Sequence, residues 1–260
     1  MTAKAKNQEH PFFKLGKSPA KRDPRNIKLA AVLKALPQTP AQWDFDVDRA
    51  KCVIPTPVFA NDWLGDCVMA GRAHMTLRLE NFEQDGKLLP ITDRIVINQY
   101  KREGGSMEPG YQGLVMLDSL KNWRTNGWTI ARKKYRIHAF TQIDQTKADE
   151  LKVAICFLNG VYIGLALPNS WQEQMQRGEA WHVVPGPSGR PNPHNGHCVY
   201  VCGYTSAGPV CVTWGKKQQM SWEYLATYCD EAYAIVDSRD RFVKNSPVDE
   251  AKLESLLNQL

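Results

Sequence analysis

The residue of this chain best placed to do chemistry is Cys67, in the stretch NDWLGDCVMAGRAH over residues 61–74. From Asp66 to Phe82 apolar residues recur at helical spacing, which predicts a helix over about 66–82 with Asp66 as its cap and Cys67 in its first turn. The unpaired N–H groups and the positive dipole end of a helix N-terminus stabilise a thiolate. The position therefore favours a reactive thiol, and the competing interpretation is a small buried cysteine on an amphipathic helix.

A nucleophilic thiol needs a base, and His197 is the histidine best placed to act as one. It opens the predicted strand HCVYVCGY directly after the Pro- and Gly-rich loop of residues 185–196, where a side chain can face a cleft. His74 lies on the Cys67 helix two turns away and cannot reach the thiol, while His194 is a reserve candidate. The sequence thus predicts a Cys67–His197 nucleophile and base pair.

The surroundings of both residues resemble those in the papain family of cysteine peptidases. That family has a Gln six residues before its nucleophile and a Gly two residues before it, and Asn61 and Gly65 stand at those places. The resemblance covers roughly residues 36–238 and continues in the segments IPTPVFAND, GHCVYVCGYT, VTWG and EAYAIVDS.

The resemblance implies an α+β fold of papain-like type, with a helical lobe, an antiparallel β-rich lobe and the site in the cleft between them. It further implies that Cys67 attacks a peptide carbonyl, that His197 is its base, and that the Asn61 amide and the Cys67 N–H hold the oxyanion. Substrate-binding roles are expected for Gly65, Gly113, Gly196 and Trp214. The substrate class is a peptide or protein, with no cofactor.

One position departs from the family's pattern. Aligning VTWG on Trp214 and Gly215 puts Val212 where the family has the Asn that orients its histidine, and a valine side chain accepts no hydrogen bond. In a regular strand Thr213 points to the opposite face, so it can substitute only if a bulge shifts the register. Two hypotheses remain: a cysteine peptidase with a Cys–His dyad, or a catalytically inactive papain-fold module in a microbial or viral assembly.

A metal site in the segment HNGHCVYVCGY is not expected. Strand alternation puts His197 on the face opposite Cys198 and Cys202, and the spacing matches no common zinc finger. These cysteines, together with Cys211 and Cys229, are therefore expected to fill the core.

Helical patterns dominate the first half of the chain and strand patterns the second, which sets the expected division of residues 29–245 into lobes. Helices are expected within residues 91–103, 114–127 and 147–160, and strands within 161–167, 197–205, 209–214 and 232–237. The helical lobe is then about 60–150 and the β-rich lobe about 151–245.

The net charge of +6 resides at the N-terminus. Residues 1–28 hold eight Lys or Arg against two acidic residues, and the remainder has 25 of each sign. The composition predicts a basic, disordered arm, and the functional alternative is a tether to an anionic partner such as nucleic acid. The arm is shorter than the inhibitory propeptide of the papain family, so autocatalytic maturation is not expected.

The C-terminal segment SPVDEAKLESLLNQL, residues 246–260, predicts an amphipathic helix. Ser246 is its expected cap, Pro247 its first residue, and its apolar stripe consists of Leu253, Leu256, Leu257 and Leu260. This helix is expected to dock on its own domain or to bind a protein partner.

Cysteine usage and hydropathy suggest the compartment. Seven cysteines, an odd number, lie in apolar segments, which suits a reducing environment. No apolar run approaches the ~20 residues that cross a bilayer, and the N-terminus has no secretory signal pattern. The expected location is cytoplasmic, without membrane contact, and a virion or assembly component is the alternative.

Overall fold

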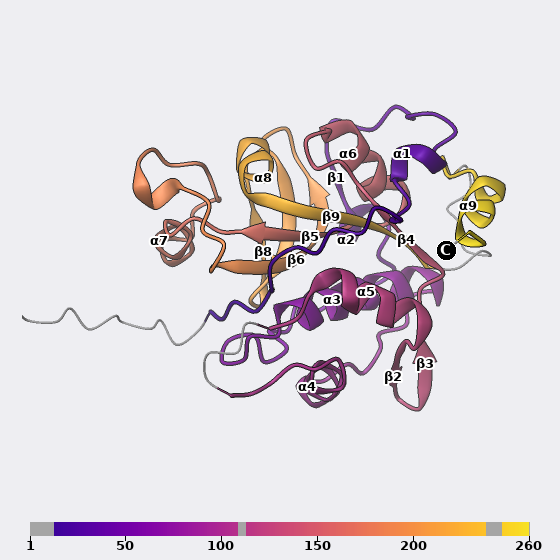
Figure 1. Cartoon of the computed structure of the whole chain (residues 1–260), viewed down its shortest axis with the longest axis horizontal. Coiled ribbons are helices and arrows are strands. Elements are labelled where there is room, and N and C mark those ends of the chain that lie inside the picture. The colour runs from indigo at the N-terminus through magenta and orange to yellow at the C-terminus, as the bar shows by residue number, and fades with distance from the viewer. Residues whose placement is uncertain (1–12, 109–112, 238–245, 260) are drawn as a thin grey trace, which may run out of the picture.

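The helical lobe is built around one long helix, α3 (Cys67–Glu83), in a computed structural model that describes residues 13–108, 113–237 and 246–259 (Figure 1). Every residue of α3 from Cys67 to Asn81 is buried, as expected of a helix packed on all sides. Around it lie two further helices and a small hairpin: α4 (Asp93–Arg102), α5 (Met116–Thr125), β2 (Trp128–Ile130) and β3 (Lys133–Tyr135).

The second lobe is a seven-stranded sheet in which every strand pair is antiparallel, with the order β4-β9-β5-β6-β7-β8 and β1 paired to β6. All nine residues of β6 are buried, so this strand is central to the core. The expected α+β, two-lobed architecture is confirmed. The strands are β1 (Trp43–Asp44), β4 (Ala139–Gln142), β5 (Val161–Ala166), β6 (Gly196–Tyr204), β7 (Pro209–Thr213), β8 (Lys216–Gln219) and β9 (Cys229–Val236).

The predicted lobe boundary near residue 150 is too simple. Strands β1 and β4 precede that boundary in the chain but belong to the sheet. The helix predicted over 147–160 is α6 (Ala148–Phe157), and it packs against β5 and β6. Sheet pairing, which joins segments distant in sequence, sets the lobes here. The remaining helical segments are α1 (Leu29–Val32), α2 (Phe45–Asp48), α7 (Trp171–Arg177), η1 (Pro187–Gly189) and α8 (Trp222–Tyr228).

The C-terminal helix α9 (Glu250–Leu257) docks on the protein itself. Its cap is Asp249, whose side chain accepts a hydrogen bond from the Lys252 N–H, so the expected cap at Ser246 is wrong. The Asp249 N–H donates to the Val32 carbonyl at 2.7 Å, and the segment following α1 pairs with Val248. Of the expected stripe Leu253 is buried, Leu256 and Leu257 are half-buried, and Leu260 lies outside the described residues.

The prediction of a disordered arm over residues 1–28 is wrong for residues 13–28. This segment, indigo in Figure 1, runs in extended form along the front of the molecule, across the sheet lobe. Three of its six cations are paired with acidic residues, because Lys17 bonds Asp230, Lys21 bonds Asp118 and Arg25 bonds Asp23. Residues 1–12 lie outside the described residues, and an anionic partner for the arm stays a prediction.

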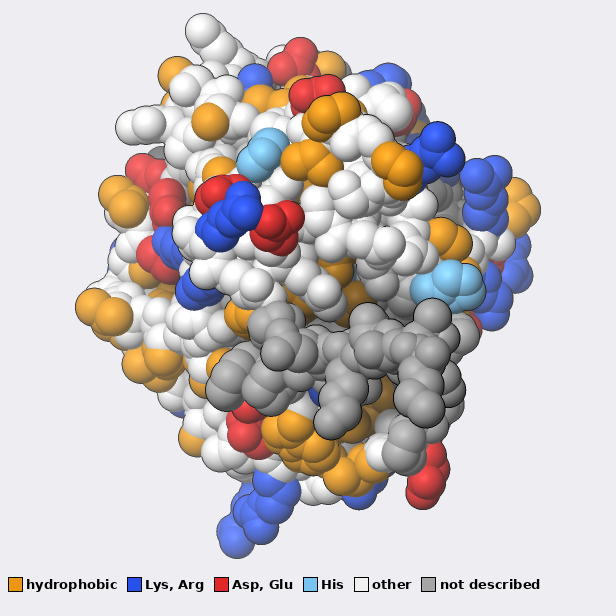
Figure 2. Space-filling view, turned by 90° about the vertical axis from the view of Figure 1, so that its left-hand side faces the viewer, with side chains coloured by type: hydrophobic (Ala, Val, Ile, Leu, Met, Phe, Trp, Pro, Cys, Tyr) orange, Lys and Arg blue, Asp and Glu red, His pale blue; other side chains and the backbone are white. Residues whose placement is uncertain are grey.

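One face of the molecule is mixed in charge (Figure 2). On the face shown in Figure 2, Lys and Arg side chains lie among Asp and Glu side chains, as expected for a body with 25 of each sign. Among the described residues, no helix is both long and apolar enough to span a bilayer.

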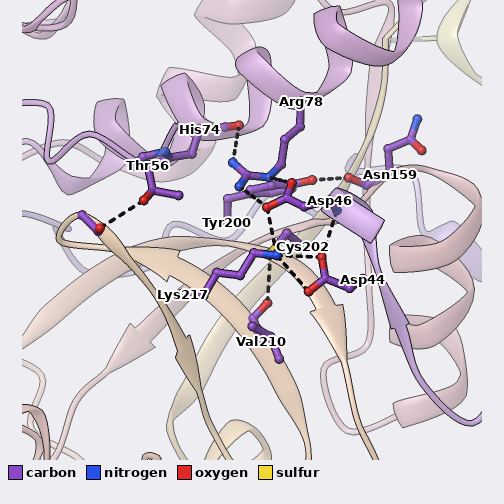
Figure 3. Close-up of polar contacts among 11 residues, drawn as sticks. Asp44, Asp46, Thr56, His74, Arg78, Asn159, Tyr200, Cys202, Val210 and Lys217 are labelled. Atoms are coloured by element: carbon purple, nitrogen blue, oxygen red, sulfur yellow. Dashed lines mark hydrogen bonds and ion pairs between the residues drawn. The ribbon is translucent and has the colours of Figure 1, made fainter. Parts of the chain in front are cut away.

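A half-buried charge cluster around the buried Arg78 fastens α3 to the sheet lobe (Figure 3). Both Nε and Nη2 of Arg78 donate to the Asp46 carboxylate at 2.9 Å. The Lys217 ammonium lies 2.9 Å from Asp46 and 2.7 Å from Asp44, whose side chain also caps α2. The cluster joins α3, α2, β1 and β8, and so helps to fix the helix that begins at Cys67.

Candidate active site

Cys67 is the first residue of α3, as the sequence predicts. The side chain of Asp66 makes no cap hydrogen bond, contrary to expectation, while the Asp66 backbone carbonyl accepts from Met69 and Ala70. The thiol is buried, and the Cys198 N–H donates to its sulfur at 3.4 Å. Burial raises the pKa of Cys67 to about 12, and the N–H groups of Cys198 and Gly16 act in the opposite direction. Burial thus outweighs the helix terminus here, and the thiol is neutral.

His197 lies in β6, directly before the residue whose N–H contacts the sulfur. Its Nε2 lies 2.8 Å from Oγ1 of Thr213, and its Nδ1 has no hydrogen-bond partner among the described residues. Burial lowers the pKa of His197 to about 3, and the nearby Lys17 charge adds to the effect. The ring is therefore neutral, held at one nitrogen and unpartnered at the other.

The partner of the histidine ring is thus Thr213, and no group on Val212 is needed. Tyr200 pairs with Val212, and continuing this register by one residue puts Thr213 opposite Val199. His197 is two residues before Val199 and shares its face, so Thr213 lies diagonally across from the ring. The sequence allowed Thr213 to substitute only if a bulge shifts the register, and the β6–β7 pairing does shift between Val201 and Gly203, with Thr213 on the face of His197.

A tight turn follows Thr213 and shapes this corner of the site. Thr213 pairs with Lys216, and both residues between them, Trp214 and Gly215, have positive φ, of 41° and 81°. This is the two-residue hairpin geometry that matches strand twist. The Thr56 hydroxyl donates to the Gly215 carbonyl at 3.0 Å and holds the turn from outside (Figure 3).

Trp214 covers the histidine. Its ring stacks on His197 with centroids 4.1 Å apart and planes 12° apart, and it stacks on Trp171 from another side. Trp222 contacts Tyr204, with ring centroids 6.1 Å apart. Stacking on one tryptophan therefore excludes water from this side of the imidazole.

Asn61 is buried in the turn that leads into α3. Its side-chain amide donates to the Leu64 carbonyl at 3.0 Å, and the two preceding residues, Phe59 and Ala60, have positive φ of 57° and 68°. Such conformations are uncommon outside glycine and show that the turn is held by its surroundings. An oxyanion-binding role for Asn61 stays a prediction.

No protein-family model matches the chain, and no curated protein matches it. Solved structures do. Xylellain, a cysteine protease from Xylella fastidiosa, is 15% identical with a TM-score of 0.67, over 88% of this chain and 97% of its own. A cysteine protease of Carica candamarcensis is 14% identical with a TM-score of 0.55, over 77% of this chain and 100% of its own. Procathepsin L 3 of Tenebrio molitor is 12% identical with a TM-score of 0.58, over 86% and 77% respectively.

The chain has the papain-like fold. Identities of this size establish the fold alone, so the chemistry of this papain-like site must be argued from its own residues.

The three glycines expected to bind substrate all contact the protein's own N-terminal arm. A Cβ atom on Gly65 would lie 2.7 Å from the Leu15 carbonyl oxygen, and one on Gly113 would lie 1.8 Å from that of Gly16. A Cβ on Gly196 would lie 2.0 Å from the Lys17 carbonyl oxygen. Only glycine permits this approach of backbone to backbone, and in this structure the groove of the papain-like fold is occupied by residues 13–18.

The arm is bonded to both walls of that groove. The N–H groups of Gly16 and Lys17 donate to the Gly196 carbonyl at 3.2 and 3.1 Å, on the sheet side. On the helical side, Leu114 exchanges backbone hydrogen bonds with Gly16 and Ser18 at 3.1 and 2.9 Å. The closed groove explains why Cys67 and His197 are both buried.

Sequence reasoning missed the ion pairs of Lys17 with Asp230 and Glu231 at the start of β9. From the sequence, Lys17 is interpreted as a solvent-exposed charge of the arm, because only the folded structure brings it next to β9. One signal was available: Glu231 opens the apolar run AYAIVD, and a carboxylate at the edge of a buried strand needs a partner.

One group of carboxylates among the described residues is close enough to share a cation: Glu80, Glu83 and Asp237. Glu80 is 13 residues along α3 from Cys67, or about 20 Å at the helical rise, so this group is separate from the candidate active site.

Proposed function

We propose that the protein is a papain-like cysteine peptidase with Cys67 as nucleophile and His197 as base. One observation carries the proposal: the His197 ring is held at Nε2 by Thr213 and stacked by Trp214, while its Nδ1 is unpartnered beside the strand residue that contacts the Cys67 sulfur. The buried His74 also has an unpartnered Nδ1, so what distinguishes His197 is its place directly before the residue whose N–H contacts the Cys67 sulfur. A base that must take a proton needs one nitrogen free.

The proposed reaction is acyl transfer to the thiol. Nδ1 of His197 takes the Cys67 proton, and the thiolate attacks the peptide carbonyl carbon. The oxyanion is stabilised by the backbone N–H of Cys67 and the Asn61 amide. The intermediate expels the amine, which takes its proton from His197, and water deprotonated by His197 then releases the acid product and the free thiol.

We further propose that the structure is the closed form of the enzyme. Residues 13–18 fill the groove, and the Gly16 N–H, which donates to the Gly196 carbonyl, also acts to lower the pKa of Cys67. Activity requires that the arm leave the groove, after which solvent returns and the pKa values of both groups move toward their ordinary range.

The Gly16→Ala variant tests this without shortening the chain. A Cβ on Gly16 would lie 1.8 Å from the Gly65 carbonyl oxygen, so the alanine expels the arm and leaves the catalytic residues intact. We expect a thiol-directed epoxide probe at pH 7 to label Cys67 of Gly16→Ala at least about tenfold faster than Cys67 of the wild type. Adding Cys67→Ala or His197→Ala should remove this labelling.

The chain holds its own reference thiol, because Cys52 is exposed whereas the other six cysteines are buried. Mass spectrometry of the labelled protein should show Cys67 of Gly16→Ala reacting faster than Cys52. Labelling of Cys67 no faster than that of Cys52, or unchanged by His197→Ala in a variant with native circular dichroism, favours instead the catalytically inactive papain-fold module, with a structural or binding role.

An intracellular location is part of the proposal. All seven cysteines lie in the described part of the chain as free thiols, which suits a reducing compartment. Protein alkylated at lysis of its native source and then unfolded should show seven alkylated thiols, and a disulfide would contradict this location.

A further inference from the structure

Lys17 places its side chain in a closed pocket next to the thiol. It is the residue after Gly16, whose N–H acts to lower the pKa of Cys67, and its side chain is 1% exposed. The ammonium lies 2.9 Å from Asp230 and 3.3 Å from Glu231, and it also donates to the Ser18 carbonyl. A lysine that the sequence assigns to a solvated arm is thus one of the most buried cations of the molecule.

The pocket belongs to the sheet and not to the arm. Its floor is Gly164 of β5, which pairs with Cys198 on one side and with Glu231 on the other. A Cβ on Gly164 would lie 2.6 Å from Cε of Lys17 and 2.8 Å from Asp230 Oδ1 and from Glu231 Cγ. The glycine therefore provides the room for a long side chain, and Gly164, Asp230 and Glu231 all belong to β5 and β9.

The Glu231 carboxylate in this pocket depends on the Lys17 ammonium for its counter-charge. Glu231 is 2% exposed, and its Oε2 accepts from the Tyr233 hydroxyl at 3.1 Å. Its Oε1 has no hydrogen bond among the described residues and faces the ammonium of Lys17. Without a cation this carboxylate is buried without a counter-charge, a costly state.

We propose that this pocket, formed by Gly164, Asp230 and Glu231, selects a lysine or arginine side chain of the peptide substrate, and that Lys17 occupies it as the protein's own stand-in. The inference rests on the proposed peptidase function and names its substrate class. Asp230 and Glu231 also line a cavity of about 500 Å³, whose other walls are Gln142, Gln145, Tyr233, Lys28 and residues 20–24 of the arm.

The test uses the full chain with Gly16→Ala and peptide probes that carry a thiol-reactive group. The probes are identical except that a lysine, arginine, leucine or glutamate stands at each of the three positions nearest the reactive group in turn. We expect the lysine and arginine probes to label Cys67 at least about tenfold faster than the leucine probe at one of these positions, because one ion pair forms in a dry pocket. Glutamate should be slowest.

Adding Glu231→Gln should abolish the basic preference and leave the leucine rate within about threefold, since glutamine keeps the size and loses the charge. Gly164→Ala should slow all long side chains together. The matched control is Glu223→Gln, an exposed glutamate of α8, which should leave every rate unchanged.

The outcomes separate the two proposals. Equal rates for lysine and leucine probes at all three positions, or a basic preference that survives Glu231→Gln, overturns the acidic pocket while His197-dependent labelling of Cys67 sustains the peptidase. Absence of Cys67 labelling by every probe, with native circular dichroism, overturns both.

Discussion

The imidazole of His197 is oriented by a single hydroxyl, that of Thr213, together with the stacked Trp214 ring. We expect Thr213→Val, in the Gly16→Ala chain, to lower kcat for peptide hydrolysis by about 10²-fold with a small change in KM, because a misaligned base loses catalysis rather than binding. Steady-state kinetics with a basic peptide measures this.

Two companion variants separate orientation from packing. Thr213→Ser keeps the hydroxyl and should stay within a few-fold of the parent, and Thr213→Asn should also retain activity by offering an amide oxygen. Full kcat in Thr213→Val would show that the hydroxyl does not position the base.

At this scale, the sequence predicts those features that depend on residues close together in the chain. Cys67 at a helix start and Gly65 beside it can be predicted from neighbours in the chain. The Thr213–His197 bond depends on how β6 and β7 register, which strand patterns do not fix. The Lys17 pocket depends on the contact between Lys17 and Asp230, which are more than 200 residues apart, and no residue near Lys17 in the sequence predicts that contact.

At the scale of elements, α3 is held from behind by the charge cluster of Arg78, Asp46, Lys217 and Asp44 (Figure 3). We expect Arg78→Met to lower the free energy of unfolding by about 3 kcal/mol, because the Arg78 side chain is fully buried and its removal leaves Asp46 half-buried beside Lys217 alone. Urea denaturation followed by circular dichroism measures the change.

A double-mutant cycle gives the control. Asp46→Asn alone and with Arg78→Met should yield a coupling of 1 kcal/mol or more, as roughly expected of a contacting pair. Additive effects of the two substitutions would mean that the cluster does not fasten α3 to the sheet lobe.

The elements themselves were predictable where their patterns are long. The helices expected within 91–103, 114–127 and 147–160 are observed as α4, α5 and α6, and the strand patterns are observed as β5, β6, β7 and β9. The two-residue strand β1 is too short to show a periodic pattern in the sequence, and it is a strand because it pairs with the end of β6. The cap of α9 moved from Ser246 to Asp249 because residues 247 and 248 are bonded to the α1 region.

At the scale of the whole molecule, the arm joins the two lobes along the line where they meet. Residues 16–18 bond to Gly196 on the sheet side and to Leu114 on the helical side. Closure of the groove also buries His197, and burial lowers its pKa so that the ring is neutral. Opening and closing of the groove should therefore change the pKa of His197. The acid stability of the protein should therefore be governed by its buried histidines.

His74 allows this to be measured apart from catalysis. It is buried on α3 against Phe59, and burial, with the Arg78 charge in second place, lowers its pKa to about 3. In the unfolded chain its pKa is about 6.5, so the unfolded state binds the proton more tightly and stability from this group, complete above pH 6.5, is lost as the pH falls toward 3. From pH 7 to pH 5 the loss is about 2 kcal/mol for one histidine.

We therefore expect the free energies of unfolding of wild type and His74→Phe, measured by urea denaturation at pH 7, 6 and 5, to diverge as the pH falls. The phenylalanine cannot bind a proton, so the variant should gain about 2 kcal/mol on the wild type between pH 7 and pH 5, whatever its offset at neutral pH. Every other titrating group, including Asp66 with its pKa raised to about 8 by burial, is common to both proteins and cancels in the difference. Parallel curves would mean that His74 is protonated in the folded state and that α3 is more accessible to water than its burial indicates.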